Sequence, residues 1–231
     1  MRLIVLSDLH VGSHSHDLDR LSQIVKEVAQ EQFDILLLPG DFVNMQIFGG
    51  GRIQPERIAS VLEPLTQKVK TFAVLGNHDA EYGLEHVGQC LTSVGIQVLQ
   101  NSWSRCVTNS GDLYIVGLED ESTGAPDFET ASKGVPNDAP LLVLAHDPAS
   151  AMYLPDRAML VVSGHTHGGQ VRLPWLGPLI NSSQAPLAWS QGHVRLGLRH
   201  LVVSAGLGTS ILPFRFNCPP EILQIELATT P

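Results

Sequence analysis

The sequence is poor in cysteine and in basic residues, and each shortage excludes a class of protein. Its three cysteines, Cys90, Cys106 and Cys218, are odd in number and form no CxxC pair. We therefore expect reduced thiols that pack in the core of a cytosolic protein, and neither a disulfide framework nor a thiolate zinc site. The 14 Lys and Arg against 23 Asp and Glu give a formal net charge of -9. General binding to nucleic-acid phosphates is therefore not expected.

Long apolar runs are also lacking. The run of residues 3–6 after Arg2 is too short for a signal peptide or a membrane span, so we expect a cytoplasmic protein without a transmembrane segment. One apolar loop within residues 171–180 contains Trp175, Leu176 and Ile180. We expect these side chains to pack in the core, with peripheral contact to a membrane surface as the alternative.

What the chain does contain is an alternation of apolar strands and helices. At 231 residues and 43% hydrophobic content it can bury a full core, and we expect one domain over residues 1–231. Apolar runs over residues 2–7, 34–38 and 71–75 predict strands, and the 3-4 spacing after them predicts helices over 17–32, 55–67 and 81–93. Shorter strands follow after residue 102. This order predicts an α/β fold, a sandwich of two sheets with helices outside.

Five of the predicted strands end in side chains that can bind metal ions. Polar groups at the carboxyl ends of strands in layered α/β folds converge on one rim. The set holds two aspartates, one asparagine and four histidines, a donor mixture suited to Mn, Fe or Zn. These residues are Asp8, His10, Asp41, Asn77, His146, His165 and His167, with His78 beside them.

Two of the histidines are separated by one residue, in Gly164-His165-Thr166-His167-Gly168-Gly169-Gln170. In an extended HxH the side chains point to opposite sides, which suits two neighbouring metals better than one. Polar turn histidines are the alternative explanation of this stretch taken alone.

As an ordered set, these motifs resemble those of the calcineurin-like metallophosphoesterases. That family has DxH, GD, GNH(D/E), H and GHxH in this order, and here they read Asp8-Leu9-His10, Gly40-Asp41, Gly76-Asn77-His78-Asp79, His146 and Gly164-His165-Thr166-His167. The resemblance spans nearly the whole chain. It implies a four-layer α/β/β/α sandwich of two mixed sheets flanked by helices.

The resemblance also implies roles for the residues. Two divalent ions, with Mn favoured over Fe or Zn, would share Asp41: the first with Asp8, His10 and His167, the second with Asn77, His146 and His165. A hydroxide bridging the two ions would attack the phosphorus in line with the leaving group. His78 would donate a hydrogen bond to the phosphoryl group or protonate the leaving oxygen.

One position departs from the family pattern. Many relatives carry GDxxD, whose last aspartate orients the catalytic histidine and raises its basicity, whereas this chain has Asn44 there. Asn44 can orient His78 but supplies no charge. We therefore expect a phosphodiester or a pyrophosphate with a good leaving group as substrate. A phosphomonoesterase of broad specificity is the alternative, and an interaction scaffold of the same fold is the alternative from another class.

The carboxyl-terminal part narrows the resemblance to a branch. Gly168-Gly169-Gln170 and residues 204–222 look like the branch with membrane-associated bacterial phosphodiesterases and some lipid-precursor pyrophosphatases. This implies a small phosphate ester, lipid-linked in some members, as the partner; the oligomeric state stays open. Arg215 could steady a substrate phosphate with bidentate hydrogen bonds, or it could be structural.

Overall fold

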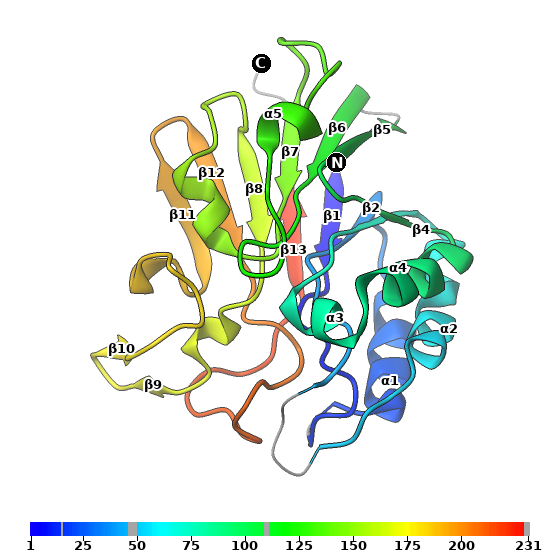
Figure 1. Ribbon diagram of the computed structural model, residues 1–231, viewed down its shortest axis with the longest axis vertical. Coiled ribbons are helices and arrows are strands. Elements are labelled where there is room, and N and C mark those ends of the chain that lie inside the picture. The colour runs from blue at the N-terminus through cyan, green and yellow to red at the C-terminus, as the bar shows by residue number, and fades with distance from the viewer. Residues whose placement is uncertain (15, 46–49, 109–110, 229–231) are drawn as a thin grey trace.

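Two mixed sheets face each other at the centre of the molecule (Figure 1). The computed structural model describes residues 1–14, 16–45, 50–108 and 111–228. The first sheet has the order β13-β1-β2-β3-β4, in which β1 to β4 run parallel and β13 pairs antiparallel with β1. Its strands are β1 (Arg2–Val5), β2 (Ile35–Leu38), β3 (Lys70–Ala73), β4 (Ile96–Val98) and β13 (Leu223–Glu226).

The second sheet has the order β11-β12-β8-β7-β6-β5. Its four central strands are parallel, while β11 and β5 at the edges are antiparallel to their neighbours. A small hairpin of β9 and β10 lies apart from both sheets (Figure 1). The strands are β5 (Ser102–Thr108), β6 (Gly111–Gly117), β7 (Leu141–Leu144), β8 (Leu160–Ser163), β9 (Arg172–Leu173), β10 (Gly177–Pro178), β11 (Gly192–Leu196) and β12 (Arg199–Val203).

Helices cover the outer face of each sheet, as the sequence predicts. Helix α1 begins where expected, because the Asp17 side chain accepts a hydrogen bond from the backbone N–H of Arg20. The outer layer of the second sheet is thin. The helices are α1 (Leu18–Val28), α2 (Pro55–Thr66), α3 (Asn77–Tyr82), α4 (Leu84–Ser93) and α5 (Phe128–Ala131), with 3-10 turns η1 (Pro148–Met152), η2 (His167–Gly169) and η3 (Leu187–Trp189).

The helix predicted over residues 81–93 is in fact two helices. Gly83 separates α3 from α4 with a φ of 134°, a backbone conformation that favours glycine. Helix α3 also starts four residues earlier than predicted, after a three-residue connection from β3. As a result, Asn77 and His78 lie in the first turn of a helix.

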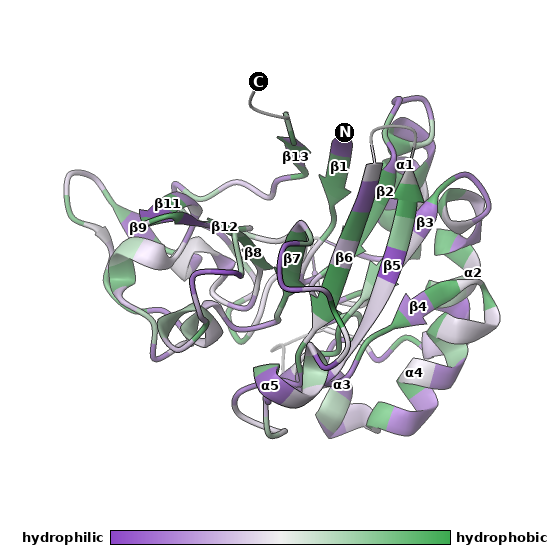
Figure 2. Ribbon diagram, turned by 90° about the horizontal axis from the view of Figure 1, so that it is seen from above, coloured by the Kyte–Doolittle hydropathy of each residue, from purple (hydrophilic) through white to green (hydrophobic). Residues whose placement is uncertain are grey.

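Strand β1 shows how the sheets are packed. Leu3 and Val5 belong to the apolar cluster between the two sheets, whereas Ile4 and the following Leu6 belong to the cluster that contains the helices. A third cluster lies on the outer face of the second sheet. Strands buried on both faces are continuously apolar, and Figure 2 shows β1 and β7 coloured as such. The four-layer arrangement is confirmed.

Two other expectations have different outcomes. The three cysteines are free and buried, as expected. The core packing expected for the apolar loop is wrong: Trp175 is fully exposed and Leu176 and Ile180 are 72% and 76% exposed, at and beside the β9–β10 hairpin. Within the described part of the chain, no helix is long and apolar enough to cross a membrane.

Candidate metal centre

The seven predicted ligands lie together where the parallel strands of both sheets end. They follow β1, β2 and β3 of the first sheet and β7 and β8 of the second. Asp41 lies in the middle: its Oδ2 is 3.3 Å from His10 Nε2 and 3.4 Å from His146 Nε2. Its side chain is almost completely buried, so these polar atoms meet away from bulk water.

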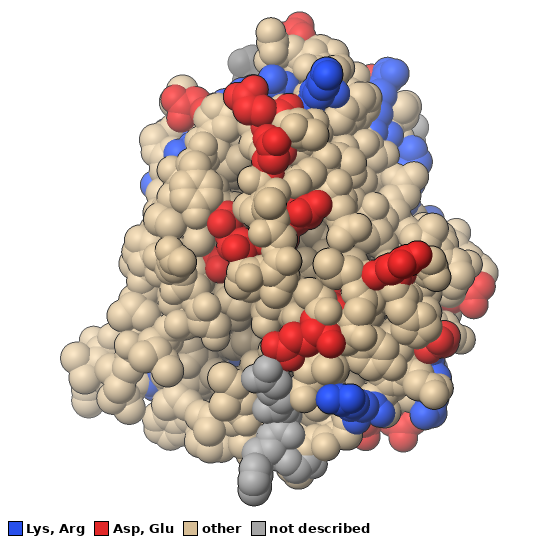
Figure 3. Space-filling model, in the orientation of Figure 1, with Lys and Arg blue, Asp and Glu red and all other residues tan. Residues whose placement is uncertain are grey.

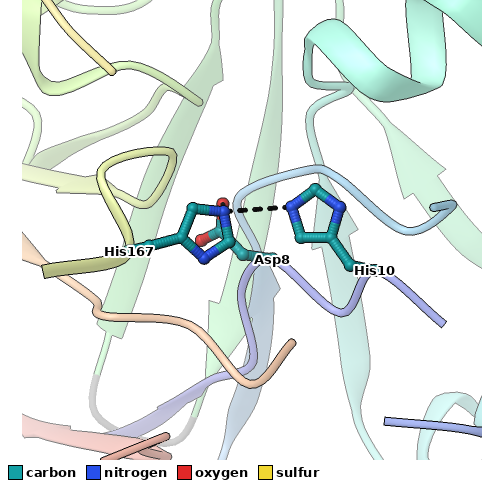
Figure 4. A group of neighbouring side chains, drawn as sticks. All are labelled: Asp8, His10 and His167. Atoms are coloured by element: carbon teal, nitrogen blue, oxygen red, sulfur yellow. Dashed lines mark hydrogen bonds and ion pairs between the residues drawn. The ribbon is translucent and has the colours of Figure 1, made fainter. Parts of the chain in front are cut away.

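Asp8, His10 and His167 form a cluster on one side of Asp41 (Figure 4). The Nε2 atoms of His10 and His167 are 3.1 Å apart, and Figure 4 shows the two rings pointing toward each other beside Asp8. His167 Nε2 is 3.7 Å from an oxygen of Asp8. Four donor atoms of four residues thus converge once Asp41 is included.

A second cluster lies on the other side of Asp41. His165 Nδ1 is 3.0 Å from His146 Nε2, which is itself 3.3 Å from the Asn77 side-chain oxygen. The two imidazoles of the HxH motif fall in different clusters, but the motif is not extended as predicted: His165 and His167 have positive φ, and Thr166 between them is in the right-handed helical conformation. Their assignment as metal ligands stays a prediction.

The electrostatic environment of these clusters favours the binding of cations. Burial raises the pKa of Asp41, but the neighbouring His146 and His10 outweigh it and hold this pKa well below its usual range. Burial lowers the pKa of His146, yet Asp41 raises it well above its usual value. Burial and His10 lower the pKa of His167, which leaves a neutral imidazole. A buried carboxylate that attracts positive charge, among nitrogen atoms aimed at one another, fits a pair of divalent ions.

The backbone at these residues is unusual. Ten non-glycine residues of the described chain have a positive φ, and five of them are predicted ligands. Such conformations cost free energy and persist where the surrounding structure enforces them, often at functional sites. The five are Asp8, His10, Asp41, His165 and His167.

Two glycines let the ligands approach the backbone. A Cβ on Gly76 would lie 2.3 Å from Asp41 Oδ1 and 2.6 Å from the His146 ring, and a Cβ on Gly164 would lie 2.3 Å from Asp8 Oδ2. Real Cβ atoms do not come this close to other atoms. Only glycine therefore fits at these two positions of the GNH and GHxH motifs without a steric clash.

Asp79 holds the loops after β2 and β3 together. Its Oδ2 accepts hydrogen bonds from the backbone N–H groups of Asp41 and Gly76, and its Oδ1 accepts from those of Phe42 and Val43. Asp79 therefore caps α3 through Gly76 and also supports the loop that carries Asp41. Its place directly after His78 was the only signal.

His78 lies beside both clusters without joining either through a hydrogen bond of its ring. Its backbone N–H donates to Asp41 Oδ1 at 2.9 Å, and its Nε2 is 3.4 Å from Ser210 Oγ. Its Nδ1 is buried without a hydrogen-bond partner among the described residues, and so is Asn44 Oδ1. The Asn44 amide instead donates to the carbonyl of Gly51. Sequence reasoning missed Ser210, which no spacing links to His78.

Arg215 is engaged with backbone carbonyls. Its guanidinium donates to the carbonyls of Ala205, Gly206, Gly208 and His167, and Nη2 is 3.4 Å from His167 Nδ1. These bonds occupy the donors that a bidentate phosphate contact requires. The geometry thus matches the structural alternative, in which Arg215 ties the loop after β12 to His167.

The two facing sheets, with divided imidazole and carboxylate clusters at their strand ends, place the chain among the metallophosphoesterase folds. The sequence model of the family described as Calcineurin-like phosphoesterase matches residues 1–169. The chain therefore belongs to this family, whose members use divalent metals.

Relatives and solved structures agree with this assignment. "Phosphodiesterase YaeI" of Escherichia coli (strain K12) is 33% identical over 98% of this chain and 82% of its own length. "Uncharacterized metallophosphoesterase YkuE" of Bacillus subtilis (strain 168) is 28% identical over 99% of this chain and 79% of its own. The structure of a 5'-nucleotidase precursor from Thermus thermophilus superposes with a TM-score of 0.55 at 16% identity, over 89% of this chain and 49% of that one. It shows the likeness of the fold.

Proposed function

We propose that the protein is a phosphohydrolase that uses two divalent ions to cleave a phosphodiester or a pyrophosphate bond. The observation that supports this most is the place of Asp41, with one oxygen within 3.4 Å of an imidazole of each cluster. The first ion would be held by Asp8, His10, Asp41 and His167. The second would be held by Asp41, Asn77, His146 and His165.

The bound ions would supply positive charge for the phosphate and a hydroxide nucleophile at neutral pH. Oxygen and nitrogen donors without sulfur favour manganese, with iron or zinc as alternatives. Around them, Asp79 and Arg215 hold the loops that carry Asp41 and His167. The protein's own contribution is thus to fix the ligands in strained, buried positions before a substrate arrives.

His78 is the candidate proton donor. Burial lowers its pKa, and the negative charge of Asp41 only partly opposes this. Asn44 adds no charge to hold a proton on the ring. Substrates whose leaving group needs little protonation are therefore favoured, as in diesters and pyrophosphates with good leaving groups. A small phosphate ester of this kind is the proposed partner.

Hydrolysis of bis(p-nitrophenyl) phosphate with added Mn²⁺ tests the proposal, with p-nitrophenyl phosphate as the monoester comparison. We expect turnover of the diester above that of the monoester, and loss of both in Asp41→Asn. A higher rate with the monoester would support the monoesterase alternative. No turnover by the wild type despite bound metal, or equal turnover by Asp41→Asn, would contradict the proposal and favour a scaffold.

A further inference from the structure

An apolar pocket of about 420 Å³ lies directly beside the candidate metal centre. This volume is within the range of pockets that hold small ligands. Five apolar side chains form much of its wall, and we call them the apolar wall: Val171, Leu179, Ile180, Ile211 and Leu212.

The pocket is lined by one histidine of the site and is connected to two more through hydrogen bonds of its lining residues. His167 lines it directly. Ser182, another lining residue, accepts a hydrogen bond at its carbonyl from His165 Nε2 at 2.9 Å. Ser210, a third, has its hydroxyl 3.4 Å from His78 Nε2. A molecule whose phosphate occupies the metal centre would therefore have its remaining part next to the apolar wall.

The two sides of the pocket are held together by Gln170. Its side-chain Nε2 donates to the carbonyl of Leu212 at 3.0 Å, and its Oε1 accepts from the backbone N–H of Ser210 at 2.9 Å. The carbonyl of Gln170 accepts from the N–H of Phe216 as well. Because Gln170 itself follows the HxH motif, the same loop fixes both the ligand His167 and the pocket.

Much of this apolar surface faces water. Leu179, Ile180 and Ile211 are 58%, 76% and 61% exposed, and the neighbouring hairpin adds Trp175 and Leu176. Single exposed apolar side chains are ordinary, but a contiguous group beside a polar site is typical of a binding surface.

The part of the sequence that forms the pocket contains no acidic residues. No Asp or Glu occurs between Asp156 and Glu221, although the protein carries 23 of them. Figure 3 has the orientation of Figure 1, and it shows no Asp or Glu on the visible surface over the β9–β10 hairpin. Arg172 and Arg215 lie in this stretch. The residues that line the pocket include no Asp, Glu, Lys or Arg, so a hydrocarbon chain bound there would bury no charged side chain.

We propose that the apolar wall binds the hydrocarbon part of an amphipathic phosphate ester, with the phosphate at the metal centre. This rests on the proposed function and specifies its substrate class. The hydrocarbon loses water contact against the apolar wall, so affinity increases with chain length.

Mixed p-nitrophenyl alkyl phosphodiesters, from methyl to octyl, test the proposal with the Mn²⁺-loaded full chain below the micelle concentration. We expect kcat/KM to rise by up to about fourfold for each methylene that is buried. Equal kcat/KM for the methyl and octyl esters would overturn the proposal and leave the phosphodiesterase function intact. Absence of turnover with every ester would contradict the underlying function, and the pocket with it.

Variants locate the effect. Ile180→Ser and Leu212→Ser should reduce the ratio of octyl to methyl kcat/KM within each variant by roughly tenfold, because each removes a buried contact with the chain. Leu198→Ser is the matched control: Leu198 is 71% exposed, close to the 76% of Ile180, but lies at the turn between β11 and β12. A ratio that falls equally in the control would overturn the proposal.

A further experiment distinguishes a membrane lipid from a dissolved amphiphile as the substrate class. The octyl ester is compared with a long-chain ester carried in phosphatidylcholine vesicles. Faster turnover from vesicles identifies a membrane lipid as the substrate class, and faster turnover in solution identifies a dissolved amphiphile. Either result supports the proposed pocket when Ile180→Ser lowers the faster turnover. If Ile180→Ser changes neither turnover, the proposed pocket is contradicted.

Discussion

Asp79 shows how one carboxylate can support a site without contacting a ligand's side chain. Four backbone N–H groups donate to it, from the loops after β2 and β3. In Asp79→Asn the amide NH₂ would face N–H donors, so two of these bonds would be lost. We expect a decrease in the free energy of unfolding of about 1–3 kcal/mol, measured with urea. Asp127→Asn is the control, since Asp127 caps α5 and asparagine caps equally well.

The loss in Asp79→Asn should depend on pH. Burial and the neighbouring Asp41 raise the pKa of Asp79 to about 7, above its usual value. A group with a raised folded-state pKa contributes stability at low pH that is lost as the pH rises through 7. The difference from wild type should therefore be larger at pH 5 than at pH 8, both without metal. A larger difference at pH 8 would show that the carboxylate is stabilised by its four donors more than it is destabilised by burial.

Asn44 can be tested through the pH dependence of turnover. Burial lowers the pKa of His78. As the pH rises, the ring therefore loses its proton at a lower pH than an ordinary imidazole does. Asn44→Asp adds a negative charge in a buried position and should raise the pKa of His78, which moves the alkaline decline of kcat to higher pH. Asn44→Ala removes the amide without adding charge and should not cause that move. An unchanged profile in Asn44→Asp would show that residue 44 does not act on His78.

At the scale of elements, the strand ends carry most of the information. Each of the apolar runs leading to Asp8, Asp41, Asn77, His146 and His165 is a strand, so their convergence could be predicted from the sequence alone. The break at Gly83 could not, because the apolar spacing continues across it and only the backbone conformation ends the helix. The exposed hairpin around Trp175 was mispredicted for a similar reason: composition does not say whether an apolar loop is covered.

Gly76 joins an element to the site, because it precedes α3 and lies against Asp41 and His146. Gly76→Ala should lower metal affinity at least about tenfold, since the added Cβ displaces both ligands. The control is Gly88→Ala within α4, where the nearest atom is 3.8 Å away and alanine favours the helix by about 1 kcal/mol. Metal content after dialysis and circular dichroism separate loss of metal from loss of fold. Equal metal content in both variants would contradict this account of Gly76.

For the molecule as a whole, the sequence predicts the layers and the list of candidate ligands, but not the contacts between distant loops. Ser210 reaches His78, and Arg215 reaches His167, only because β12 pairs with β8 and returns the chain to the same rim. No periodicity in residues 204–217 encodes that meeting. The apolar pocket is hidden for the same reason, since residues 179–180 and 211–212 become neighbours only in the fold.

The whole molecule should gain stability from metal ions, because the buried clusters form only when both sheets are folded. Mn²⁺ at 100 times its dissociation constant should raise the free energy of unfolding by about 2.7 kcal/mol per site, and a chelator should reverse the increase. Asp41→Asn should remove most of it, since Asp41 lies within 3.4 Å of both clusters. His193→Ala is the control: the exposed His193 and His200 pair at 2.8 Å on the second sheet, away from the strand ends. A stabilisation that survives Asp41→Asn and disappears in His193→Ala would move the metal site to that surface pair.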